Sequence, residues 1–371
     1  MRSRLRPSFG VLGWCLLLVL AAGSAHAQTL LADDDSYGIP YGGSLVVEAF
    51  GVLDNDTLDG EAAGENGATA ELVTDVSHGT LALSSDGSFT YTPGPGFDGS
   101  DSFVYRAVFS PASSEATVTL TACSGGPQVF TCWKEAAFLA KAAALGHPSF
   151  QEGFEDDALW GMARSPDTAP GVSSRGVEWR ANDFDSSHTG PPPDPPAPPP
   201  NEITTGSGPA RTGQWGIFDP EHGYAWGTPA ACDVDVPDAH CLYHDGFTVG
   251  RASGSGPLYG AGGFFTGTVG ANVAFVLNGD HANPIGGGAL SGGAHQFFGV
   301  IDAGPTGWNE IQFRELDGKV GQALLVFGDD FTVLATGAVP IPSLPTRGLI
   351  ALCAVLAVAA RWHLRRIHAG A

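Results

Sequence analysis

Alternating apolar and polar positions run through two long parts of the chain and predict β-strands in both. In the first part, residues 28–122, the runs are short and are separated by turn residues. They cover residues 44–50, 79–84, 88–92, 101–109 and 116–121. The dipeptide Asp86-Gly87 between the second and third runs is a strong signal for a β-hairpin. Strands at a spacing of about ten residues over this length predict an immunoglobulin-like sandwich.

A second set of β runs occupies residues 151–338. These runs cover residues 176–179, 213–218, 273–277, 295–301, 310–313 and 323–327. Their alternation and their glycine-rich separators predict a larger, jelly-roll-like sandwich. The proline-rich loop 189–201 within it is expected to be a solvated polyproline II segment. The expected fold class is therefore all-β.

Residues 123–150 form the expected connector between the two sandwiches. The segment Trp133–Leu145 is rich in alanine and is followed by Gly146, with Pro148 just beyond. This pattern predicts one short helix that packs against a sandwich.

Both ends of the chain carry targeting patterns. Residues 1–27 combine arginines, an apolar stretch and the site Ala25-His26-Ala27, which is typical of a signal peptide. Residues 339–371 contain the uncharged run Gly348–Ala360, which arginines follow at once. This order predicts a C-terminal transmembrane anchor with a cytoplasmic basic end, and the alternative is a buried core helix.

The net charge of the chain limits its possible partners. The formal charge of the chain is −22, but seven of its 17 basic residues lie in the two ends, which contain no acid. The segment between them has 10 basic and 39 acidic residues, a net charge of −29. Such a surface repels nucleic acid and anionic lipid, so a nucleic-acid partner is excluded from the expected functions. It offers carboxylates to divalent cations.

Four cysteines lie between the two ends, in two pairs with the same separation of nine residues. They are Cys123, Cys132, Cys232 and Cys241. In an oxidising compartment the equal short spacing favours the disulfides 123–132 and 232–241, out of three possible connectivities. Since His240 and His244 flank Cys241, a cysteine–histidine metal site is the alternative, although its spacing matches no standard zinc pattern.

Motifs for catalysis are missing from the sequence. It contains no G-x-S-x-G elbow, no H-E-x-x-H pair and no P-loop lysine pattern. A glycosidase needs two carboxyl groups that face one cleft, and the acids available for this are Glu152, Glu155, Asp156 and Asp157. A secreted glycan-active hydrolase is therefore the rival to a binding function.

Four sequence blocks of the first domain carry a family resemblance. They are Val52-Leu53-Asp54-Asn55-Asp56-Thr57, His78-Gly79-Thr80-Leu81, residues 86–93 (DGSFTYTP) and residues 96–105 (GFDGSDSFVY). In this order they resemble the cadherin-like or Ig-like repeat of bacterial surface adhesins. The resemblance implies an Ig-like sandwich with an adhesive role at the cell surface.

The remainder of the chain resembles PEP-CTERM-type exported proteins, whose β-sandwich is similar to carbohydrate-binding modules. The carrying segments are residues 153–156 (GFED), 176–179 (GVEW), 298–302 (FGVID), 311–313 (IQF) and 327–331 (FGDDF). The tail, with Ile341-Pro342-Ser343-Leu344 before the apolar run, looks like an IPTL-type sorting signal. The usual acidic-aromatic pair after that motif is replaced by Pro345-Thr346-Arg347.

These resemblances imply structural calcium at two places. In the second domain the expected ligands are Glu155, Asp156 and Asp329, and in the first domain they are Asp33, Asp35, Asp54 and Asp56. Calcium takes several oxygen ligands from acids and carbonyls on loops. The alternative is that all of these acids are solvated turn residues.

The tryptophans of the second domain are candidates for sugar contacts. They are Trp160, Trp179, Trp215, Trp226 and Trp308, among which Trp179 and Trp215 are the expected ligand-binding residues. An aromatic ring combines an apolar face with a polar edge, which suits stacking on a sugar. The alternative is that these rings belong to the core.

The sequence thus predicts an exported protein of the cell surface or extracellular matrix of a Gram-negative bacterium, with a polysaccharide-binding or adhesive role. Its expected partners are polysaccharide or matrix, the export and C-terminal sorting machinery, and the membrane through the C-terminal helix. The only expected cofactor is structural Ca²⁺.

Overall fold

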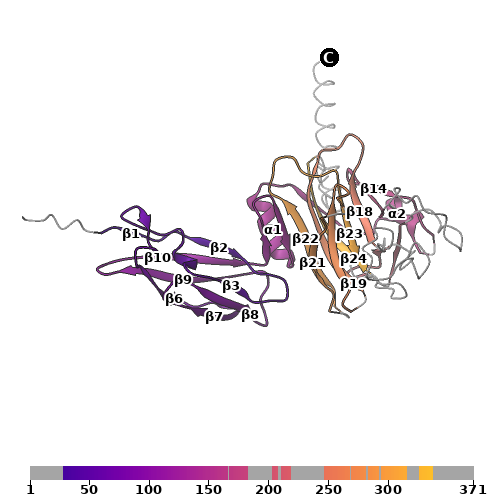
Figure 1. The fold of residues 1–371 in the computed structure, drawn as a ribbon. Helices are drawn as coiled ribbons and strands as arrows, with labels where there is room; N and C mark the ends of the chain where they lie inside the picture. The colour runs from indigo at the N-terminus through magenta and orange to yellow at the C-terminus, as the bar shows by residue number, and fades with distance from the viewer. Residues whose placement is uncertain are drawn as a thin grey trace, which may run out of the picture.

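The computed structural model describes residues 28–165, 167–182, 203–207, 210–218, 246–267, 269–280, 283–291, 294–315 and 326–336. Two β-domains lie end to end, with the helix α1 (Glu135–Ala144) on the side of the second domain that faces the first (Figure 1). The predicted signal peptide, residues 1–27, and the predicted anchor, residues 339–371, lie outside the described residues. Within those residues, no helix is both long and apolar enough to cross a membrane.

The first domain is a sandwich of the predicted strands and several short ones. Among the described residues, one sheet has the order β2 (Asp35–Gly38), β10 (Ala112–Thr121), β9 (Ser100–Phe109) and β6 (Thr69–Thr74). A second has the order β3 (Leu45–Val47), β8 (Phe89–Pro93) and β7 (Gly79–Leu83). A small third sheet joins β1 (Leu30–Leu31), β4 (Thr57–Leu58) and β5 (Glu61–Ala62), and η1 (Gly51–Leu53) is a 3-10 turn. Phe89 on β8 contacts Phe103 on β9 with ring centroids 5.4 Å apart, so the two larger sheets share one core.

The hairpin predicted at Asp86-Gly87 is confirmed. Strands β7 and β8 pair in antiparallel register from Gly79↔Pro93 to Leu83↔Phe89. Gly87 has φ 86°, a left-handed conformation that glycine adopts at little cost. The Asp86 carboxylate accepts the backbone N–H of Ser88 at 3.0 Å and closes the turn.

The second domain is a larger sandwich of two sheets, which we call the near sheet and the far sheet by their distance from the first domain. Among the described residues, the near sheet has the order β11 (Cys123–Gly125), β12 (Val129–Cys132), β22 (Gln296–Asp302), β19 (Leu258–Gly267), β24 (Val326–Ala335), β17 (Gly216–Phe218) and β16 (Thr204–Gly206), and β13 (Ser149–Glu152) also pairs with β24. The far sheet has the order β14 (Val172–Ser174), β15 (Val177–Ala181), β18 (Gly246–Arg251), β23 (Glu310–Glu315), β20 (Asn272–Leu277) and β21 (Ile285–Ala289). The short helices α2 (Asp157–Trp160) and η2 (Gly161–Ala163) follow β13. Residues 123–150 were expected to form a connector with one short helix, but its first part forms the strands β11 and β12 at the edge of the near sheet.

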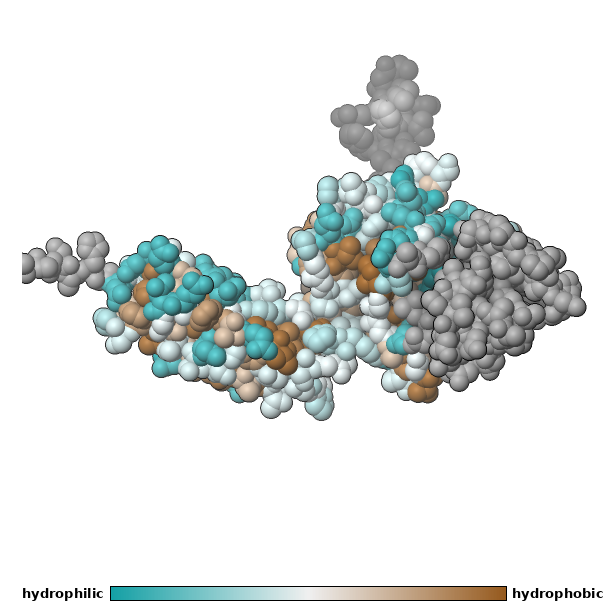
Figure 2. Space-filling view, in the orientation of Figure 1, coloured by the Kyte–Doolittle hydropathy of each residue, from teal (hydrophilic) through white to brown (hydrophobic). Residues whose placement is uncertain are grey.

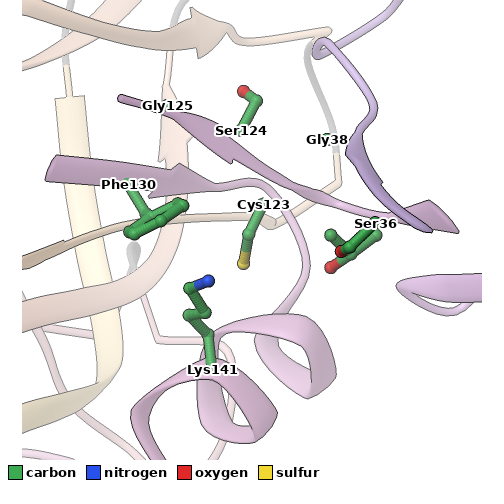
Figure 3. A pocket seen from close by; sticks show the side chains of 8 residues that line it. Ser36, Gly38, Cys123, Ser124, Gly125, Phe130 and Lys141 are labelled. Carbon is green, nitrogen blue, oxygen red and sulfur yellow. The ribbon is translucent and has the colours of Figure 1, made fainter. Parts of the chain in front are cut away.

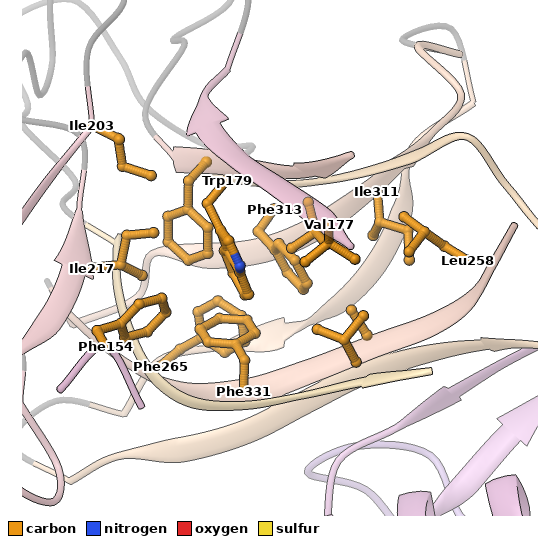
Figure 4. Close-up of a cluster of buried hydrophobic side chains, with 14 of the residues drawn as sticks. Phe154, Val177, Trp179, Ile203, Ile217, Leu258, Phe265, Ile311, Phe313 and Phe331 are labelled. Carbon is orange, nitrogen blue, oxygen red and sulfur yellow. The ribbon is translucent and has the colours of Figure 1, made fainter. Parts of the chain in front are cut away.

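Aromatic side chains fill the space between the near and far sheets. Trp179, Phe313 and Phe331 are fully buried there and contact one another (Figure 4). Alternate residues of a strand point to opposite faces, so the positions next to Trp179 and Phe313 lie on the outer face of the far sheet. This alternation fixes which side chains form the site described below.

The helix α1 packs on the outer face of the near sheet, where Gly299 leaves room for it. Gly262 on β19 pairs with Gly299 on β22. A Cβ at Gly299 would lie 2.7 Å from the ring of Phe138 on α1, closer than real contacts allow. Gly299 therefore serves the packing of α1 on the near sheet.

Apolar packing continues from the first domain into the second. One cluster of buried residues contains Leu120 and Phe97 of the first domain together with Phe138 on α1 and Ile301 and Leu334 on the near sheet. The hydroxyl of Tyr41 in the first domain also donates a 2.7 Å hydrogen bond to the carbonyl of Ala289. The two sandwiches are thus joined by a shared core.

Candidate functional site

Two of the predicted calcium ligands hold the loop before β17. Glu155 Oε1 accepts the backbone N–H groups of Gln214 and Trp215 at 2.8 and 2.9 Å. Asp329 Oδ2 accepts those of Arg211 and Thr212 at 2.6 and 3.1 Å. Carboxylates that accept backbone N–H groups in this way fix a loop without a metal ion.

Asp329 is fully buried on β24. Burial is the largest influence on its carboxyl and raises its pKa to about 6, although the backbone hydrogen bonds from Thr212 and Arg211 oppose the shift. The next residue, Asp330, forms an ion pair with Arg211 at 2.7 Å. Arg211 in turn lies 3.5 Å from the centroid of the Phe264 ring. The loop is therefore held by both charge and packing.

Asp156 has a different role from the other two. Its carboxylate accepts the backbone N–H of Ala158 at 2.9 Å and caps the N-terminus of α2. The other acids named for the rival hydrolase are also engaged. Glu152 accepts hydrogen bonds from Phe154 N–H and the Ser174 hydroxyl, and Asp157 forms an ion pair with Arg164 at 2.8 Å.

The predicted calcium ligands of the first domain are divided between its surface and its core. Asp33 and Asp54 are exposed, whereas Asp56 is buried and accepts hydrogen bonds from the Tyr105 hydroxyl and from Asp33 N–H. Asp35 Oδ2 is buried without a hydrogen-bond partner. Burial, and next the nearby Asp56 carboxylate, raise the pKa of Asp35 to about 7. Burial also raises the pKa of Asp56.

These acids do not gather into a calcium coordination shell in the arrangement described. Within the described ranges, no group of three or more His, Cys, Asp or Glu side chains is placed to hold a metal ion. Calcium requires several oxygen ligands from one cluster. Calcium binding thus stays a prediction, and thermal melts in calcium, in magnesium and in EDTA at fixed ionic strength would test it.

The two predicted ligand-binding tryptophans lie in different environments. Trp179 is fully buried between the sheets, so its ring offers no face to a sugar and serves the core. Trp215 is only partly buried, and the Arg164 guanidinium lies 4.2 Å from its ring centroid. Trp160 and Trp308 are also buried, and Trp226 lies outside the described residues.

One of the two predicted disulfides is confirmed. Cys123 and Cys132 pair across the β11–β12 hairpin and form a disulfide. Cys232 and Cys241 lie outside the described residues, and so do His240 and His244 of the alternative metal site.

A polar network on the outer face of the far sheet was not predicted. Its members, which we call the outer-face network, are Arg180, Asn182, Thr248, Glu310 and Gln312. Strand register places Arg180 opposite Thr248, and Thr248 opposite Gln312, on three neighbouring strands. Side chains in one row of a sheet lie close enough to interact, so this face is a continuous polar strip.

Hydrogen bonds connect this strip. Arg180 Nη2 donates to Glu310 Oε2 at 2.5 Å, and Gln312 Nε2 donates to Glu310 Oε1 at 3.1 Å. The Thr248 hydroxyl donates to Asn182 Oδ1 at 2.9 Å. Gly250 leaves room for the Arg180 guanidinium, because a Cβ at this position would lie 2.8 Å from Arg180 Nη1.

One acceptor in this network is unsatisfied. Gln312 is 2% exposed, and its Oε1 is buried without a hydrogen-bond partner. Thr248 and Asn182 are buried as well, whereas the side chains of Arg180 and Glu310 remain 23% and 21% exposed, so a ligand reaches the network beside this ion pair. A buried acceptor without a partner is unusual in a folded protein and marks a place where a ligand hydroxyl or water can bind.

Residues 27–121 match the family model described as a bacterial Ig domain. No curated protein sequence matches the chain significantly. Two solved structures of a carbohydrate-binding module 51-2 with INT domains from Clostridium perfringens ZmpB, one with GlcNAc bound, have 10% and 9% identity and TM-scores of 0.22 and 0.21. The alignments cover 84% and 83% of this chain and 49% and 48% of those chains, so the chain spans about half their length.

A two-domain protein of unknown function from Bacteroides fragilis NCTC 9343 is also similar, with 8% identity and a TM-score of 0.18 over 82% of this chain and 90% of that one. TM-scores this low do not establish a shared fold, and we base no conclusion on these structures. The family match, in contrast, coincides with the sandwich of β1 to β10 and ends at Thr121, the last residue of β10. The first domain of this chain is therefore a bacterial Ig-like domain.

Proposed function

We propose that this chain is an exported protein of the cell surface or extracellular matrix of a Gram-negative bacterium that binds polysaccharide through the outer-face network. The observation that carries the binding proposal is the row of Arg180, Thr248 and Gln312 beside Glu310, which includes an unsatisfied acceptor. The Ig-like domain supplies a separate module next to the binding domain.

The chemistry of the network suits a sugar. Each hydroxyl of a sugar donates one hydrogen bond and accepts others, so neighbouring hydroxyls need donors and acceptors side by side. Arg180 provides planar N–H donors, Glu310 a charged acceptor and Gln312 a free carbonyl oxygen. A ligand without hydroxyls would leave these donors and acceptors without hydrogen bonds. That loss costs binding free energy at a site shielded from water.

Export and display are supported by other features. The pattern of residues 1–27 is that of a signal peptide, and the Cys123–Cys132 disulfide fits an oxidising compartment. The tail 339–371 is the proposed IPTL-type sorting signal and membrane anchor. N-terminal sequencing of the exported chain should begin at Gln28, and deletion of residues 339–371 should release the chain from the membrane fraction.

A glycan array with the full chain tests the binding proposal. Arg180→Met removes the donors of the network, and Gln312→Leu removes the free acceptor. Arg106→Met is the matched control, because Arg106 also pairs with a glutamate, Glu115, but in the first domain.

The Arg180→Met variant should bind the recognised glycan at least about tenfold more weakly, since a hydrogen bond to a charged group contributes about 1.5–3 kcal/mol. The Gln312→Leu variant should bind it about two- to tenfold more weakly, since a neutral hydrogen bond contributes about 0.5–1.5 kcal/mol. The Arg106→Met variant should bind it like the unmodified chain. Equal binding by all of these variants would remove the outer-face network as the site. Release of reducing sugar from the array glycans would instead favour the rival hydrolase.

A further inference from the structure

A cavity of about 370 Å³ opens between the two domains (Figure 3). Its lining comes from β2 and β10 of the first domain, from β11 and β12 of the near sheet, and from α1. The edge strands β2 and β11 approach closely here, because a Cβ at Gly38 would lie 2.6 Å from the Cα of Ser124. The volume lies at the lower end of the range of small-molecule sites, which is about 300–1,000 Å³.

Lys141 supplies a positive charge to this cavity. It lies in the last turn of α1, and its Nζ sits 3.7 Å from the centroid of the Phe130 ring. In Figure 3 its amine extends between Phe130 and Cys123. The ion pairs formed by the described residues use arginine or histidine, and none of them includes Lys141.

Neither lysine that the structure describes, Lys134 or Lys141, pairs with a carboxylate, and of the two Lys141 lines the cavity. The segment between the two ends carries 39 acidic and only 10 basic residues, so carboxylates for pairing are plentiful. Phe130 attracts the ammonium through its ring face but does not neutralise its charge. Lys141 therefore keeps an uncompensated charge that an anionic ligand can satisfy.

The remaining polar groups of the cavity are hydroxyls. Ser36, Thr121 and Ser124 line it, and their hydroxyl groups form no hydrogen bond with any other residue that the structure describes. Each hydroxyl donates one hydrogen bond and accepts others. The cavity thus combines a single cation with several free hydroxyls and one aromatic wall.

We propose that this cavity binds a monosaccharide-sized ligand with one carboxylate group, of the uronic acid class. The carboxylate pairs with Lys141 Nζ, and the sugar hydroxyls bond to Ser36, Thr121 and Ser124. One ammonium balances one negative charge, whereas a phosphate dianion would leave excess charge against a segment of −29. This site goes beyond the proposed function, since it uses elements other than those of the outer-face network.

Isothermal titration calorimetry of the full chain tests the proposal with four probes: glucuronate, glucose, acetate and glucose 6-phosphate. Glucuronate should bind at least about tenfold more tightly than any of the other three, and raising the salt concentration should weaken its binding. Glucose as tight as glucuronate would overturn the role of the charge. Acetate as tight as glucuronate would overturn the role of the hydroxyls, and glucose 6-phosphate as tight would overturn the preference for one charge.

Variants of the same helix region assign the binding to Lys141. Lys141→Met keeps the methylene stem over Phe130 and removes the charge, and it should weaken glucuronate binding at least about tenfold. Lys141→Arg should retain binding. Lys134→Met is the matched control, because Lys134 lies near the Trp133 ring at the start of α1, and it should bind glucuronate like the unmodified chain.

The proposal would be overturned if Lys141→Met and Lys134→Met lost glucuronate binding to the same extent. It would also be overturned if the unmodified chain showed no detectable glucuronate binding. The Arg180→Met variant separates this site from the proposed function. It should lose glycan-array binding and keep glucuronate binding, and the Lys141→Met variant should show the reverse.

Discussion

The indole Nε1–H of Trp133 donates a 2.9 Å hydrogen bond to the backbone carbonyl of Ile39. Ile39 follows β2 in the first domain and Trp133 follows β12 at the edge of the near sheet, so this bond crosses the domain junction. The Trp133 ring also packs 5.4 Å from that of Phe97. The Trp133 side chain thus contributes both a polar and an apolar contact to the domain junction.

Replacing Trp133 by phenylalanine should lower stability. Trp133→Phe keeps an aromatic ring at the junction but leaves the buried carbonyl of Ile39 without this donor, which costs about 1–2 kcal/mol. Urea unfolding followed by fluorescence should show a lower midpoint. Tyr259→Phe serves as a control, because its hydroxyl makes only an exposed 3.4 Å contact with Pro305, and a midpoint shift as large in the control would argue against the bond.

The packing of α1 on the near sheet gives a second prediction. Gly299→Ala places a Cβ 2.7 Å from the Phe138 ring, so the helix must move or the ring must leave its position. Overpacking of this kind costs about 1–3 kcal/mol. Thermal unfolding should therefore begin at a lower temperature.

Gly286 on β21 offers the matched control for this substitution. A Cβ there meets nothing within 4 Å, so Gly286→Ala should melt like the unmodified chain. A melting temperature of Gly299→Ala equal to that of Gly286→Ala would show that α1 does not rest on Gly299.

The buried carboxyl of Asp35 gives a pH-dependent prediction. Its pKa is raised from 3.8 to about 7, so the folded chain binds a proton between these values that the unfolded chain has released. Stability should fall as pH rises from about 4 to about 7 and then level off. The raised pKa values of Asp56 and of Asp329, which is about 6, act in the same direction.

Asp35→Asn should remove the contribution of Asp35 to this fall of stability with pH. The variant should melt at a higher temperature than the unmodified chain at pH 8, with a smaller difference at pH 4, because only the charged form is disfavoured by burial. Asp54→Asn, at an exposed position, should leave the slope unchanged. Parallel pH profiles for Asp35→Asn and the unmodified chain would contradict the assignment.

The disulfide at the edge of the near sheet should stabilise the chain. It closes a loop with a sequence separation of 9, and removal of such a bond costs about 2–4 kcal/mol. The Cys123→Ser/Cys132→Ser variant should have a correspondingly lower urea midpoint. Non-reducing peptide mapping should recover the 123–132 link and tests the predicted 232–241 link in the same digest.

The predicted runs cover five of the ten strands that the structure describes in the Ig-like domain, and the signal is clearest where alternation follows the core. Phe103, Tyr105 and Ala107 on β9 are all buried, and the residues between them are not. Strand β6 was missed for the opposite reason: within its six residues only Ala70 is buried, so no alternation marks it. Strands β11 and β12 are too short for a periodic signal, and the Cys123–Cys132 pairing was the only clue to their hairpin.

Local sequence patterns could not predict the outer-face network. Residues 177–181 alternate as in any half-buried strand, and nothing nearby shows that Arg180 pairs with Glu310, 130 positions away. Trp179 illustrates the same limit, because a sugar-stacking ring and a core ring look alike until the facing sheet is known. Glu155 and Asp329 were predicted to share one calcium site with Asp156, but the loop backbone that Glu155 and Asp329 hold was not predicted.

The pairing of β2 with β10 has a mechanical consequence. These strands lie near the two ends of the Ig-like domain and run parallel, with Ser36 opposite Thr119 and Gly38 opposite Thr121. A pull on the N-terminal side of β2 against the C-terminal side of β10 slides the strands along each other and loads their hydrogen bonds together. The domain should therefore resist tension between its two ends by shear, instead of opening one hydrogen bond at a time.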